Sequence, residues 1–168
     1  MSILDRLERK LGRYAVPNLM KYICVMYALG FLIQIVAPEF YYYYLDLDPE
    51  AILHGHIWRI LSFLIYYPAS DGFSSIFWAI IGIMVYYSIG RTLEYLWGNF
   101  RYNFFFFSGV ILYNVAGILI FLFTGIALQL NPTYMGFSIF LAYALTLPDT
   151  VFYLYFFIPI KAKYLALL

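Results

Sequence analysis

One serine and two histidines are the side chains of this chain that could take part in catalysis. Ser138 follows Gly136 and Phe137 in a lone Gly-x-Ser, and His54 and His56 form a His-x-His pair. A serine hydroxyl becomes a useful nucleophile only when a base takes its proton and preorganised donors stabilise the oxyanion. Both histidines lie far from Ser138 in the sequence, so spacing alone assembles no serine–histidine pair.

The same two histidines could instead ligate a metal ion. A metal site needs at least a third protein ligand at the right distance. The nearby acids Asp46, Asp48 and Glu50 are only loosely placed relative to the pair. We therefore interpret the histidines as interfacial polar residues, and we expect neither a metal nor a cofactor.

Composition identifies the solvent of this chain. It is 65% hydrophobic and 11% charged, with a mean hydropathy of +0.82. A soluble core of 168 residues cannot bury so much apolar surface. The net charge of +1 and the lack of a basic patch argue against a nucleic-acid partner. The expected surroundings are a lipid bilayer.

Apolar stretches predict an all-α, polytopic membrane helix bundle. The expected spans are residues 19–37, 74–90, 102–123 and 134–147, with the start of another at 160–168. A cleaved signal peptide is the alternative for the first stretch, but Pro38-Glu39 follows it where small residues would be needed. Because the last apolar run stops without a polar tail, we expect that one or two C-terminal helices are missing.

Residues 1–16 differ from the transmembrane domain expected at 17–168. Leucines at 4, 7 and 11 share one helical face, and the basic residues at 6, 9, 10 and 13 share the other. This pattern favours a helix lying in the membrane interface, on an anionic leaflet. A merely solvated leader is the alternative.

Basic residues also predict the topology. An N-terminus on the cytoplasmic side places nine of the ten basic residues inside, by the rule that cytoplasmic loops carry the positive charge. Only Arg59 then lies outside, next to Trp58 in a loop at 38–72 that we expect to be half-immersed. Its guanidinium could donate to loop carbonyls or pair with Asp71, and we favour this structural role over a functional one.

A second polar cluster follows the 74–90 span. It contains Gly90, Arg91, Glu94, Trp97, Gly98 and Arg101. Glu94 could accept hydrogen bonds from Arg91, from Arg101 or from the amides at a helix end, and so join the second span to the third.

Together these motifs resemble the rhomboid and Derlin-like membrane proteins. Trp58-Arg59 resembles the family's first-loop pair, and the second cluster resembles its G-R-x-L-E turn leading into W-G-x-x-R-F. Residues 156–165 resemble the loop that opens the family's fifth helix. The resemblance covers residues 55–168 and implies a rhomboid-like fold of the bacterial type.

The catalytic residues of an active rhomboid have no clear counterparts. Alignment on Pro148 puts the nucleophile position at Thr133, and alignment on Gly90 puts the oxyanion donors near Trp78 and Gly82. Ser138 lies a turn too deep and lacks the following glycine. A base could lie on a missing sixth helix, so an intramembrane serine protease with a displaced nucleophile remains the alternative.

The resemblance therefore implies a pseudoprotease that binds transmembrane segments of client proteins, in membrane-protein quality control or trafficking. A channel or transporter is a poorer interpretation, because Glu94 is the only acidic residue between positions 74 and 147. We expect a multi-pass protein, in the plasma membrane of a bacterium.

Overall fold

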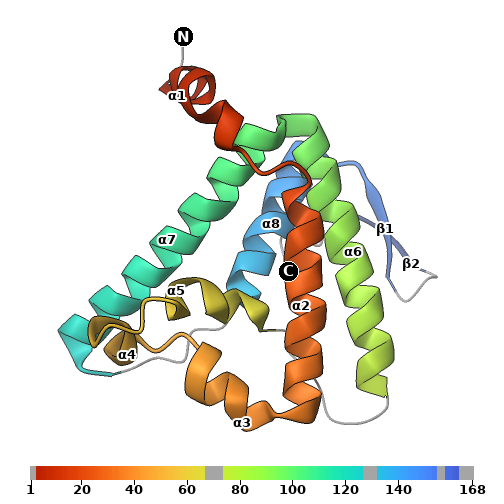
Figure 1. Cartoon of the computed structure of the whole chain (residues 1–168). Helices are drawn as coiled ribbons and strands as arrows, with labels where there is room; N and C mark the ends of the chain where they lie inside the picture. The colour runs from red at the N-terminus through yellow and green to blue at the C-terminus, as the bar shows by residue number, and fades with distance from the viewer. Residues whose placement is uncertain (1–2, 67–73, 127–131, 155–157, 163–168) are drawn as a thin grey trace.

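The computed structural model describes residues 3–66, 74–126, 132–154 and 158–162. Its body is a bundle of helices (Figure 1), with α2 at Leu19–Val36, α6 at Ser74–Trp97, α7 at Asn99–Thr124 and α8 at Thr133–Thr146. Of these, α2, α6 and α7 are long and apolar enough to cross a membrane. The fourteen residues of α8 rise only about 21 Å, which is less than a hydrocarbon core.

Short helices lie at both ends of this bundle (Figure 1). The α1 end, where α6 meets α7, carries α1 (Ile3–Leu11) and the 3-10 helix η1 (Gly12–Tyr14). The opposite end, called the α4 end here, carries the connection between α2 and α6. That connection contains α3 (Pro38–Phe40), the π-helix η2 (Tyr41–Leu45), α4 (Pro49–Leu53), α5 (Arg59–Ser62) and the 3-10 helix η3 (Phe63–Ile65).

The second span is longer than the sequence predicted. We expected this span to end at Gly90, in a motif that resembles a turn, but α6 continues to Trp97. Gly90 lies within the helix, where the absence of a side chain allows close packing against Met20 and Tyr102. The break comes at Gly98, whose φ of +84° suits glycine, and α7 begins at the next residue.

The expected polytopic helix bundle is confirmed, and the described residues add one short pair of strands to it. Strands β1 (Val151–Leu154) and β2 (Ile158–Lys161) pair antiparallel, with Val151 opposite Lys161. Residues 160 and 161, expected to start another span, therefore lie in a strand. Pro159 favours extended backbone in the residue before it and cannot continue a helix, which explains the difference. Residues 163–168 lie outside the described residues.

Glycines let the helices approach closely in the core. A Cβ on Gly30 of α2 would lie 1.5 Å from the carbonyl oxygen of Ile65 in η3. A Cβ on Gly90 would lie 2.4 Å from Sδ of Met20 and 2.9 Å from the hydroxyl of Tyr102. Small residues at such crossings are typical of membrane helix packing.

Candidate functional site

Glu94 holds the start of the first spanning helix. Its Oε1 accepts a hydrogen bond of 2.9 Å from the amide of Leu19, the first residue of α2, and the side chain is only 6% exposed. The first amides of a helix have no partner within the helix, so a carboxylate there satisfies one of them and complements the helix dipole. Glu94 thus joins α6 to α2, whereas the sequence suggested a link between α6 and α7.

Asn103 extends this contact to the residues before α2. Its Oδ1 accepts from the amide of Val16 at 3.0 Å, and its Nδ2 donates to the Val16 carbonyl at 2.9 Å and to the Asn99 carbonyl at 2.7 Å. Sequence reasoning missed this residue. Its position two residues after Arg101, as a polar group in an apolar helix, was the available signal.

Arg101 binds α1 rather than Glu94. Its guanidinium lies 3.1 Å from Asp5 and 3.2 Å from Glu8, both on α1. The charged side chains are about 40–50% exposed, so water screens these ion pairs. Glu94, Asn103 and Arg101 together hold residues 5–19, and we call this set the N-terminal clasp.

The other residues of the second motif have local partners. Arg91 is exposed and donates to the Tyr87 hydroxyl at 2.7 Å, one turn back on the same helix. Trp97 packs edge-on against Phe105, with ring centroids 5.5 Å apart. Arg91 thus bonds within α6, whereas Trp97 packs α6 against α7.

At the α4 end, the Trp58-Arg59 motif caps a helix. The carbonyls of residues 43–46, at the end of η2, accept hydrogen bonds from three side chains that follow later in the sequence. Trp58 Nε1 donates to Tyr44 at 3.1 Å, and Ser62 Oγ donates to Leu45 at 2.9 Å. Arg59 donates to Asp46 at 2.9 Å and also to Tyr43. We call these three residues the loop clasp.

Burial explains why this cap uses an arginine. Arg59 is 6% exposed, and a guanidinium offers several donors in a fixed plane, so one side chain serves two carbonyls. A cation at a helix C-terminus also complements the helix dipole. These are the loop carbonyls that the sequence offered as partners; Asp71 lies outside the described residues.

Asp46 follows the capped helix and is partly buried. Burial raises the pKa of its carboxyl above the usual value, and the amide of Leu47 and the guanidinium of Arg59 act in the opposite direction. The buried Tyr41 has its pKa raised as well, chiefly by burial. Both groups are part of the packing of the connection between α2 and α6, where the Tyr41 hydroxyl donates to the Phe63 carbonyl at 3.4 Å.

Within the part of the chain that the structure describes, the hydrogen bond of Ser138 is to its own helix and not to a catalytic base. Its side chain is exposed, and Oγ donates at 3.0 Å to the carbonyl of Tyr134, one turn earlier on α8. Thr133 begins α8, and its side chain is outside what the structure describes. The hydroxyl of Ser138 is thus used within its own helix, as is common for serine in apolar helices.

The two histidines lie at the α4 end, in exposed positions. His54 Nδ1 lies 2.8 Å from the carbonyl of Glu50, and the His56 ring stacks at 4.8 Å on Trp58. Among the described residues, no three His, Cys, Asp or Glu side chains form a group that could hold a metal ion.

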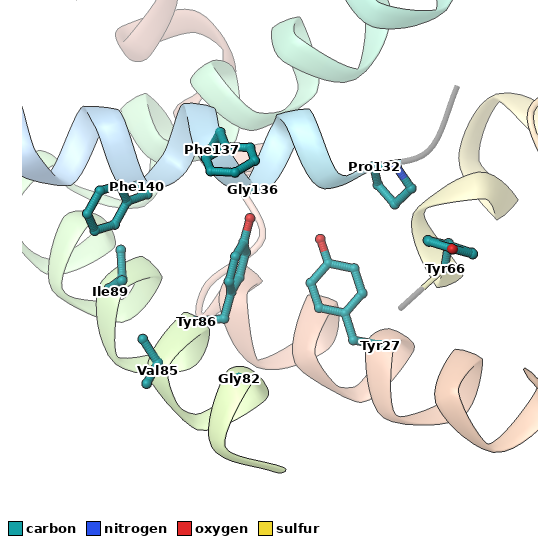
Figure 2. Close-up of a pocket in the computed structure, with 10 residues that line it drawn as sticks. All are labelled: Tyr27, Tyr66, Gly82, Val85, Tyr86, Ile89, Pro132, Gly136, Phe137 and Phe140. Carbon is teal, nitrogen blue, oxygen red and sulfur yellow. The ribbon is translucent and has the colours of Figure 1, made fainter. Parts of the chain in front are cut away.

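A cavity of about 330 Å³ opens between α2, α6 and α8 (Figure 2). Apolar side chains make up most of its wall, with glycines at 82 and 136. The lining residues are Tyr27, Tyr66, Gly82, Val85, Tyr86, Ile89, Pro132, Gly136, Phe137 and Phe140. Of the expected oxyanion positions, Gly82 is therefore at the cavity, whereas Trp78 is not among its lining residues.

Tyrosine side chains supply the polarity of this cavity, from positions 27, 66 and 86. Tyr27 from α2 and Tyr86 from α6 both point their hydroxyls toward α8, as Figure 2 shows, and their rings make an edge contact at 5.7 Å. The Tyr86 hydroxyl is buried without a well-aligned hydrogen bond among the described residues, and the Tyr27 side chain is near enough to interact with it. A Cβ on Gly136 would lie 2.2 Å from the Tyr86 hydroxyl, so this glycine makes room for it.

The fold and these sites define a polytopic integral membrane protein, with clasped helix ends and an apolar cavity among its helices. Residues 19–168 match the family model described as eukaryotic integral membrane protein (DUF1751), and the chain belongs to that family. The expected plasma membrane of a bacterium is thereby unsupported, because the family is eukaryotic. Comparison with curated proteins and with solved structures gave no significant match.

Proposed function

We propose that this protein is a rhomboid-like pseudoprotease that binds transmembrane helices of client proteins at the cavity between α2, α6 and α8. The observation that carries the proposal is this cavity beside an α8 whose Ser138 hydroxyl is engaged by its own helix. The scaffold thus offers a place to bind a helix without an assembled nucleophile. A role in membrane-protein quality control or trafficking follows from such binding.

The dimensions of the cavity suit a side chain of a client rather than a whole helix. At about 330 Å³ it accommodates a few side-chain groups. Gly82 lies in its wall, and small residues allow two helix backbones to approach. A client helix would therefore lie along the opening and insert one residue between α6 and α8.

The buried hydroxyl of Tyr86 favours clients with a polar residue. In hydrocarbon, a hydroxyl without a well-aligned hydrogen bond gains more from a partner than it would in water. A client amide or carboxamide in the apolar cavity would provide that partner. Helices that carry such a residue are also the ones that a quality-control protein needs to recognise.

A defined reporter tests this proposal. A photocrosslinking residue replaces Val85 in the cavity wall, or Leu112 on the exposed face of α7 as the control. Single-span reporters of polyleucine, with or without one central asparagine, are co-expressed with each variant. We expect the asparagine reporter to crosslink severalfold more at position 85, and Tyr86→Phe to remove the preference.

Equal crosslinking of both reporters at both positions would overturn the proposal. The protease alternative is tested separately by labelling the folded protein with a fluorophosphonate probe, alongside Thr133→Ala and Ser138→Ala. Labelling that only Ser138→Ala abolishes would establish a displaced nucleophile and make the protein a protease.

A further inference from the structure

A second apolar groove separates α1 from α7, away from the cavity of Figure 2. Its volume is about 400 Å³. Leu7, Leu11, Tyr14 and Ala15 line one side of it, and Phe100, Asn103, Phe104, Phe107, Ser108 and Ile111 line the other. The polar groups of Asn103 are engaged by Val16 and Asn99, so the groove offers an apolar ligand mainly hydrocarbon contacts.

The groove runs from one boundary of the membrane toward its interior. α7 is a candidate spanning helix, and Arg101 in its first turns binds α1, so α1 lies at the membrane boundary (Figure 1). The α7 lining extends from residue 100 to residue 111. At 1.5 Å per residue this is roughly 16 Å, which is about the depth of one leaflet's hydrocarbon.

Positive charge gathers on the N-terminal segment that forms one side of the groove. Arg101 neutralises part of the charge of Asp5 and Glu8, whereas α1 and η1 carry four basic residues of their own. Lys10 and Arg13 are exposed, and each directly precedes a lining residue, Leu11 and Tyr14, in the sequence. The Arg13 guanidinium also donates to the Tyr14 hydroxyl at 2.8 Å, which holds it beside that lining residue.

We propose that this groove is a binding site for an anionic phospholipid. One acyl chain lies between α1 and α7, and the phosphate is held at the mouth by Lys10 and Arg13. A lipid fits both features at once. Its charged headgroup lies at the membrane boundary, as the cations do, and its acyl chain lies deeper, as the apolar groove does. Its binding would fasten α1 to α7 more strongly than the exposed Arg101 ion pairs do.

The test is native mass spectrometry of the detergent-solubilised full chain, titrated with phosphatidylserine or phosphatidylcholine. Lys10→Gln with Arg13→Gln removes the charge at the mouth, and Ser108→Phe fills the groove. The matched controls are Lys21→Gln with Arg91→Gln, which removes two other exposed cations, and Leu112→Phe on another face of α7. Variants are compared only where the melting temperature equals that of the wild type.

We expect one molecule of phosphatidylserine to bind tightly and phosphatidylcholine to bind with lower affinity. Each cation removed should lower the affinity for phosphatidylserine about fivefold. Ser108→Phe should lower the affinity for both lipids, and the control variants should change neither affinity.

Three results would overturn the site. The first is equal binding of both lipids to the wild type. The second is a loss on charge removal with no effect of Ser108→Phe, which would indicate diffuse surface attraction. The third is displacement of the lipid by inorganic phosphate alone.

Discussion

The N-terminal clasp and the loop clasp both satisfy free backbone groups at a helix end, but they do so with charges of opposite sign. At the α1 end a carboxylate, Glu94, accepts a hydrogen bond from the first amide of α2. At the α4 end a guanidinium, that of Arg59, donates to carbonyls at the end of η2. Both charged groups are 6% exposed. Each sign is the one that complements the free groups and the dipole at that helix end.

The difference between the clasps lies in how much each charged residue does. Arg59 serves two carbonyls, with Trp58 and Ser62 serving the two between them. Glu94 serves one amide, and neutral Asn103 holds the preceding residues. Where water cannot substitute for a lost partner, a residue that satisfies more backbone groups should cost more to remove.

Arg59→Ala should give the largest loss. It leaves two partly buried carbonyls without donors and removes a buried side chain, which we expect to lower the free energy of unfolding by about 3 kcal/mol. Denaturant titration in mixed micelles measures this, with exposed Arg91→Ala as the control. A loss for Arg91→Ala as large as that for Arg59→Ala would refute the loop clasp.

Glu94→Ala should cost less, about 2 kcal/mol, because one helix-end amide loses its acceptor and the helix start loses a negative charge. Glu94→Gln retains an acceptor oxygen and should recover at least half of that loss. The same titration compares the two variants. If glutamine were as harmful as alanine, the charge rather than the hydrogen bond would dominate.

Gly90→Ala tests whether steric fit at the α1 end matches the polar contacts in importance. The added methyl would overlap Met20 and the Tyr102 hydroxyl, so we expect a loss of about 1 to 2 kcal/mol. Gly109→Ala is the matched control within a spanning helix, since its nearest contact would be an ordinary 3.8 Å. Equal effects on the melting temperature would contradict the close crossing.

Arg101→Ala should have the smallest effect, below about 1 kcal/mol, because its ion pairs are exposed. The contribution of Arg101 to the stability of the wild type should also decrease when the salt concentration is raised, whereas the contribution of Glu94 should persist. Melting temperatures at low and high salt measure both. A large, salt-independent loss would place Arg101 with the buried residues of the N-terminal clasp.

Polar residues in apolar sequence predicted much of this arrangement. Arg59 and Glu94 stood out because charged residues are costly inside a membrane, and both are buried at hydrogen-bonded contacts. Their partners were less predictable. Glu94 binds a residue 75 positions earlier, and periodicity along one helix contains no information on which neighbour supplies a free amide.

The sequence by itself determined the solvent and the helical character of the chain, because composition and the length of apolar runs depend on no distant contact. It also marked the residues that need partners. Only the tertiary structure decided which partners these are and that α6 continues to Trp97. Those outcomes depend on helix ends and crossings that meet in space, and residues far apart in the chain jointly determine them.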